Sequence, residues 1–265
     1  MKQLAIVLCM LMVCGCHGRN EAKPADVSDT PREAVEKGAP SVENSWGPED
    51  YAAFAGYLSK LTRDSYPRFN STRSKALFMK LVDSVEQPIF ASNEVPFNRR
   101  MELALQMIDG ANTALKTYCA AHNSGIDYST ELMYLQGLVL SVTRQFLVLV
   151  DEFIPTIDPN DGKYEVRMQG LRQLKRGIAE ELSGAIVSMQ ETKAYSDSQR
   201  LILAKYLARE ATAILHHLDQ DARQELEGKV KEMKSVEKDN GIRELLSVIT
   251  DKFEQNTTGD AQATK

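Results

Sequence analysis

The sequence lacks the short motifs that identify the common classes of enzyme. It contains no Gly-x-Ser-x-Gly nucleophile elbow, no His-Glu-x-x-His metalloprotease motif, no phosphate-binding Gly-Lys-Ser/Thr loop and no dinucleotide-binding glycine fingerprint. Carboxylate-bridged di-iron bundles need Glu-x-x-His on two helices, and the chain has no such pair. These absences exclude the corresponding activities, and we expect a protein that is not an enzyme and has no cofactor.

Histidine and cysteine are scarce, at four residues each. Cys119 and His122 lie one helical turn apart, and His216 and His217 follow later in the chain. Because no acidic residue or second cysteine accompanies them at metal-ligand spacing, Cys119 is interpreted as a small core residue, and His122 and His217 as cap or surface residues. Glu210 and His217 share a helix face but stand about 10 Å apart, too far to bind one ion. We therefore expect no metal site.

An excess of basic charge is also lacking. The net charge of −5 and the isoelectric point of about 5.5 argue against nucleic acid as a partner. One predicted helix is a local exception, and its basic residues are Lys163, Arg167, Arg172, Lys175 and Arg176. They are interpreted either as a surface for an acidic protein or lipid headgroups, or as a solvated face balanced by Glu165, Glu180 and Glu181. The second interpretation is favoured.

The first residues of the chain hold most of its cysteine, because Cys9, Cys14 and Cys16 account for three of the four. Lys2 provides a positive charge, and residues 4–13 form an apolar run of about ten residues. This run has the length of a secretory signal and is too short to span a bilayer. The pattern predicts a signal peptide over residues 1–15.

The run Val13-Cys14-Gly15-Cys16 resembles the lipobox of bacterial lipoproteins. The resemblance covers about residues 1–18 and departs from the commonest pattern at Val13 and Cys14. It implies cleavage after Gly15 and lipid modification of Cys16, whose two or three acyl chains would hold the protein stably on a membrane. It also implies a location in the bacterial cell envelope, and His17 in place of aspartate implies the outer membrane of a two-membrane cell.

Two alternatives to lipid attachment are an ordinary cleaved signal peptide and a zinc or redox Cys-x-Cys site. The zinc or redox site is the weaker alternative, because Cys9 and Cys14 lie in the segment that would be removed. With Cys16 acylated, the sequence predicts a buried thiol at Cys119 rather than a disulfide.

Composition divides the remainder of the chain into three parts. Residues 16–47 contain three prolines and many small or charged residues, and predict a disordered tether with a reach of about 30 Å. Residues 48–254 predict one helical domain, which is long enough to bury a substantial core. Residues 255–265 predict a disordered tail.

The helix period dominates the predicted domain, and no convincing alternating strand pattern appears in it. Apolar residues recur every three or four positions, as in Leu203, Leu207, Ala211, Ile214 and Leu218. The sequence therefore predicts an all-α bundle of about seven or eight mostly antiparallel helices. Their expected positions are near 48–63, 71–87, 97–122, 128–154, 162–193, 197–218, 220–236 and 240–254.

The predicted helix from Leu132 to Pro155 is apolar on nearly every side, as in a membrane span or the central helix of a bundle. Charged residues interrupt it, so we expect the central helix. Arg144 and Asp151 lie on broadly the same side of it. They are interpreted either as lining a pocket together with Tyr134 or as an internal ion pair, and the ion pair is favoured.

An anchored helical domain with few motifs favours a protein-binding module that works at the envelope surface. Toxin-neutralising immunity lipoproteins and envelope assembly factors are similar in outline, and the identity of the partner is not predicted. The alternative is a small-molecule or ion carrier with a pocket around Tyr134, Arg144 and Asp151.

Overall fold

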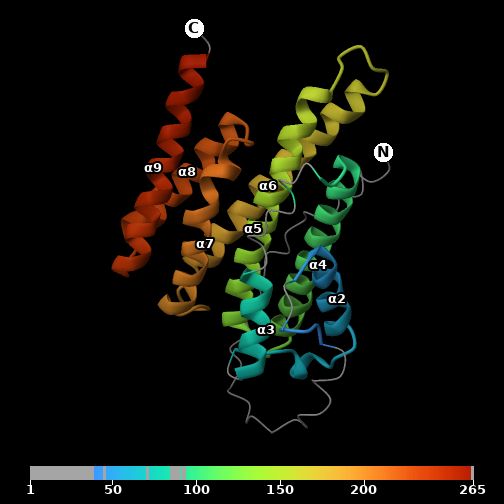
Figure 1. The fold of residues 1–265 in the computed structure, drawn as a ribbon. Helices are drawn as coiled ribbons and strands as arrows, with labels where there is room; N and C mark the ends of the chain where they lie inside the picture. Colours follow the sequence, from blue (N-terminus) through green and yellow to red (C-terminus); the bar gives the residue numbers. More distant parts are fainter. Residues whose placement is uncertain (1–38, 44–45, 70–71, 84–89, 91–93, 264–265) are drawn as a thin grey trace. The chain divides into compact units, whose positions relative to one another are not determined.

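The computed structural model describes residues 39–43, 46–69, 72–83, 90 and 94–263. Within these ranges the chain forms eight α-helices and no strand, which confirms the predicted all-α fold (Figure 1). The helices are α2 (Pro48–Leu58), α3 (Thr72–Asp83), α4 (Phe97–Asn123), α5 (Ser129–Phe153), α6 (Tyr164–Gln190), α7 (Asp197–Leu215), α8 (Gln220–Val236) and α9 (Asn240–Ala263). Gly15 and Cys16 lie outside the described residues, so cleavage and lipid attachment stay predictions.

Local sequence signals account for where the helices begin. Before α7, the Ser196 hydroxyl accepts a hydrogen bond from the Gln199 amide at 3.4 Å, and the Gln199 side chain accepts one from the Ser196 amide at 2.9 Å. This reciprocal pair is a capping box. Before α2, the Gly47 amide donates to Asp50 Oδ2 at 2.7 Å, and Pro48 occupies the first helical position.

Two ends differ from the expected ones. The first helix stops at Leu58, and a short 3-10 turn over Arg63–Ser65 follows it. The last helix continues to Ala263, whereas the sequence predicts an end near 254. Both differences occur where apolar periodicity is too short or too weak to fix an end.

The chain divides into two compact units at the middle of α5. We call the described residues up to Val142 the N-terminal unit and those from Thr143 onward the C-terminal unit. The sequence predicts one domain over residues 48–254, so the division is a feature that periodicity did not indicate.

The N-terminal unit has an aromatic core. Trp46 is almost fully buried and meets Tyr51 edge to face at a centroid distance of 6.2 Å, so packed structure begins before the expected domain boundary at 48. Helix α2 packs on α4. At Gly110 the two backbones approach so closely that a Cβ would lie 2.6 Å from the carbonyl carbon of Tyr51.

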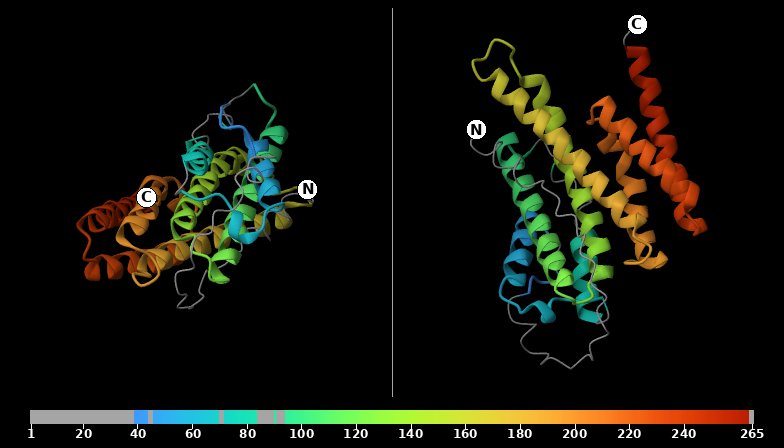
Figure 2. Two further views of the ribbon diagram at one scale, coloured as in Figure 1. Left: turned by 90° about the horizontal axis from the view of Figure 1, so that it is seen from below. Right: turned by 180° about the vertical axis from the view of Figure 1, so that it is seen from behind.

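In the C-terminal unit, α6 packs on α7 and α8, and α9 packs on the same two helices (Figure 2). The interior is mainly aliphatic, but it also holds the fully buried side chain of Arg200. The Arg200 guanidinium pairs with Glu237, contacts Asp197 at 2.7 Å and donates to the Met189 carbonyl at 2.6 Å. These bonds join the start of α7 to the end of α6 and the end of α8.

Helix α5 is the central apolar helix that the sequence predicts. Among the described residues, the segment Ser129–Thr156 is the one helix with the length and composition of a membrane span. Of the most apolar stretch of this helix, 78% is buried inside the protein, as expected for a core helix. Its last turns and the start of α6 form an antiparallel hairpin, closed by residues 154–163.

Candidate functional site

The structure places the three predicted pocket residues in different surroundings. Tyr134, in the N-terminal unit, stacks on Phe69 with ring centroids 4.4 Å apart. In the C-terminal unit, Arg144 Nε lies 2.5 Å from Glu210 Oε2, whereas Asp151 faces two histidines. The favoured interpretation of an Arg144–Asp151 ion pair is therefore wrong, because each residue contacts a different group.

Glu210 is fully buried and sits between two arginines. Arg209 Nε donates to Glu210 Oε1 at 2.7 Å, and Arg144 contacts the other carboxylate oxygen. A buried carboxylate needs such compensation, because it has lost its hydration. Arg144 thus has a structural role in joining α5 to α7.

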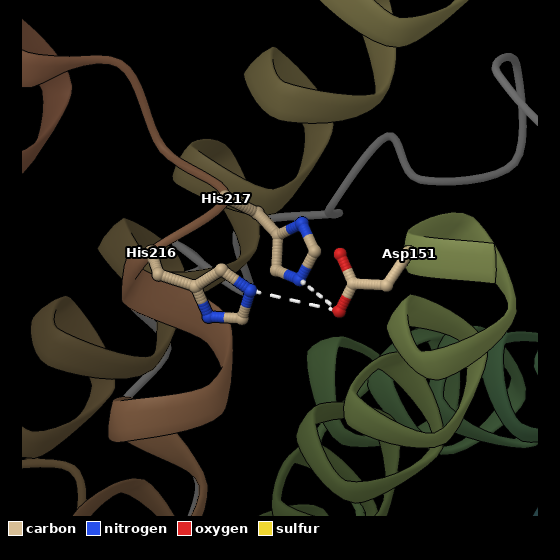
Figure 3. A group of neighbouring side chains, drawn as sticks. All are labelled: Asp151, His216 and His217. Carbon is tan, nitrogen blue, oxygen red and sulfur yellow. Dashed lines mark ion pairs between the residues drawn. The ribbon is translucent and has the colours of Figure 1, made fainter. Parts of the chain in front are cut away.

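Asp151 lies in the last turn of α5, and His216 and His217 follow the end of α7 (Figure 3). Asp151 Oδ2 is 3.7 Å from His216 Nε2 and 3.6 Å from His217 Nε2. One possible ligand atom from each of the three residues lies within 4.8 Å of the others. We call these three residues the Asp–His–His cluster.

The members of the cluster differ in exposure. The side chains of Asp151 and His216 are 52% and 49% exposed, whereas that of His217 is 7% exposed. His217 Nε2 is buried and accepts or donates no hydrogen bond within the described structure. Burial lowers the pKa of His217 to about 4, and the neighbouring His216 adds to this effect. His217 is therefore neutral at neutral pH and keeps a lone pair on its ring.

The burial of His217 corrects the sequence interpretation, which placed it at a cap or on the surface. His122 behaves as expected of a cap residue, because its Nδ1 accepts a hydrogen bond from the Tyr128 amide just after α4 ends. Cys119 is buried, as expected, but it is disulfide-bonded rather than a thiol.

The basic residues of α6 are largely neutralised within the chain. Three ion pairs join Arg167 to Asp161 at 3.0 Å, Arg172 to Glu165 at 4.0 Å and Lys175 to Asp219 at 2.7 Å. Lys163 and Arg176 are exposed and have no acidic partner among the residues that the structure describes. Of the acidic residues expected to balance this face, Glu165 pairs with Arg172, whereas Asp161 and Asp219 supply the other two pairs.

Exposed apolar side chains occur at the end of the α5–α6 hairpin. Val166 is 70% exposed and Ile154 is 43% exposed. The loop between them is held by Asp158, whose Oδ1 accepts from the Asn160 amide at 2.8 Å, and by Asp161, whose Oδ1 accepts from the Lys163 amide at 3.0 Å. We call residues 154–167 the hairpin end.

A buried carboxylate was missed by the sequence reasoning. Glu181, expected on the solvated face of α6, is buried, and its Oε2 accepts a hydrogen bond from the Thr143 hydroxyl at 3.0 Å. Burial raises its pKa to about 7. The helix period of α6 could have indicated this burial, because Glu181 lies three residues after the buried Ile178 and directly before the buried Leu182.

Comparison of the chain with protein-family models, with curated proteins and with solved structures finds no match. A function must therefore be inferred from the structure itself, and two of its features bear on function: the hairpin end and the Asp–His–His cluster.

Proposed function

We propose that this chain is a lipid-anchored protein of the bacterial envelope, and that its helical body binds another envelope protein through the hairpin end. The observation that supports this proposal is the exposure of Val166 and Ile154 at the tip of a hairpin whose loop is fixed by its own hydrogen bonds. An ordered loop presents these apolar side chains at a small entropic cost, and this favours binding.

The charges around the hairpin end favour a protein partner over a lipid surface. Binding to anionic headgroups depends on unneutralised basic residues. Here Arg167 is paired with Asp161, and the hairpin end carries Asp158, Asp161 and Glu165 against the basic residues Lys163 and Arg167. Exposed apolar residues that lie near charges of both signs are typical of a protein–protein interface.

The anchor rests on the resemblance of residues 1–18 to a lipoprotein signal. The Cys16→Ala protein should lose acylation and cleavage after Gly15, which the intact mass of the membrane-extracted protein would reveal. Normal cleavage of this variant would contradict the anchor.

Photocrosslinking in the native host tests the partner surface. A photoreactive benzoylphenylalanine at Val166 should give a discrete crosslinked protein, which mass spectrometry identifies. The same group at Gln173, which is exposed on the same helix, is the matched control and should give little of that product. Equal crosslinking from both positions, or no product from Val166, would overturn the assignment of the hairpin end.

A further inference from the structure

We propose that Asp151, His216 and His217 form a binding site for a divalent transition-metal ion, with Zn²⁺ as the ion that this donor set fits. The site is independent of the hairpin end. It gives a specific form to the ion-binding alternative that the sequence left open. Its donors come from α5 and from the turn after α7, which only the fold brings together.

The distances in the cluster fit shared ligation better than direct hydrogen bonding. A charged hydrogen bond between an imidazole and a carboxylate has a length of about 2.7–2.9 Å. Asp151 Oδ2 stands 3.6 and 3.7 Å from the two Nε2 atoms. Bonds of about 2.0–2.2 Å to a tetrahedral Zn²⁺ place the ligand atoms about 3.4 Å from one another. The two distances to Asp151 are thus within a few tenths of an ångström of this value, and the ligand atoms of the whole cluster, which lie within 4.8 Å of one another, would have to move closer together around the ion.

The buried nitrogen of His217 is the second, independent observation. Its side chain is 7% exposed, and Nε2 points toward Asp151 without a hydrogen bond in the described structure (Figure 3). Leaving a buried polar atom unsatisfied costs about 1–3 kcal/mol, so such atoms are rare in native proteins. A metal ion between the three side chains would satisfy this nitrogen.

The chemical nature of the donors selects the class of ion. Imidazole nitrogens suit Zn²⁺ and other later transition metals, whereas Ca²⁺ and Mg²⁺ prefer sites made of oxygen ligands. Two neutral imidazoles and one carboxylate leave one positive charge on a divalent ion. Three protein ligands also leave a coordination position for water or an anion. The half-exposed Asp151 and His216 give the ion access from solvent.

Calorimetric titration of tag-free mature protein with Zn²⁺ tests the site. We expect one equivalent of Zn²⁺ to bind and to raise the thermal unfolding midpoint. Asp151→Asn and His216→Gln should each weaken binding by more than about tenfold, because each removes a direct ligand. Both residues are half exposed, so neither change should prevent folding, and circular dichroism checks this.

His122→Gln is the matched control, because it removes a histidine of the other unit. It should leave the affinity for Zn²⁺ unchanged. Substitution of Co²⁺ gives a second measurement, since a tetrahedral or five-coordinate site has visible absorption bands that should vanish in His216→Gln. Absence of Zn²⁺ binding to the parent protein, or binding that His216→Gln leaves unchanged, would refute the proposal.

Discussion

The two units of the chain differ in how they satisfy polar groups inside them. In the N-terminal unit these groups bond to the main chain, as when the Tyr51 and Tyr118 hydroxyls donate to the carbonyls of Leu81 and Pro67 at 2.9 and 2.8 Å. Its buried Glu131 likewise accepts a hydrogen bond from the Phe69 amide.

In the C-terminal unit, charged side chains meet other charged side chains. Arg200 pairs with Glu237, and Arg144 pairs with Glu210. Main-chain bonds fix loops around a core, whereas ion pairs join one helix to another and depend on protonation. The comparison teaches that the C-terminal unit holds buried ion pairs that join its helices, and the Asp–His–His cluster lies in the same unit.

The largest expected effect comes from breaking a buried ion pair. Arg200→Met leaves the buried Glu237 carboxylate without its partner, and this should lower the free energy of unfolding by about 3–5 kcal/mol. Urea denaturation followed by circular dichroism measures the loss. The double variant Arg200→Met/Glu237→Met should lose much less, because it removes both charges; an equal loss would argue that packing, not charge, explains the effect.

Glu181 should make the stability of the C-terminal unit depend on pH. Its pKa rises from an ordinary 4.5 to about 7 on burial, so the folded state binds the proton more tightly than the unfolded state. The free energy of unfolding should therefore fall as pH rises from 4.5 to 7, by up to about 3 kcal/mol.

The variant Glu181→Gln tests this assignment. It should be more stable than the parent at pH 8 and should lose this part of the pH dependence, as thermal unfolding at pH 5 and pH 8 would show. A variant that keeps the full slope would place the titrating group elsewhere.

The smallest effect is expected in the N-terminal unit. Tyr118→Phe removes one hydrogen bond to the Pro67 carbonyl and keeps the aromatic packing, so it should cost about 1 kcal/mol. Because no ion pair is lost, the cost should be the same at pH 5 and pH 8. A cost that changed markedly between these values would weaken the contrast between the units.

Much of the fold follows from local signals in the sequence. The bounds of α4, α7 and α8 agree with the predicted ones to within a few residues, because amphipathic periodicity and caps act over one or two turns. The buried character of α5 follows from its composition for the same reason. The division into two units was not predictable, since it depends on contacts between distant segments.

The Asp–His–His cluster shows the same limit. Asp151 was singled out as a polar group on an apolar helix, and the histidines as possible ligands without an acid. Their meeting depends on how α5 packs against the turn after α7, which no local pattern reports. Of the two adjacent histidines, His217 is buried whereas His216 is half exposed, and the sequence does not show this difference.

The position of Trp46 has a practical consequence. It is the only tryptophan in the chain, and it is almost fully buried in the N-terminal unit. Its fluorescence emission should shift to the red when that unit opens, whereas the far-ultraviolet signal reports the helices of both units. Two optical probes recorded on one unlabelled sample would thus reveal whether the halves of this molecule melt together or in sequence.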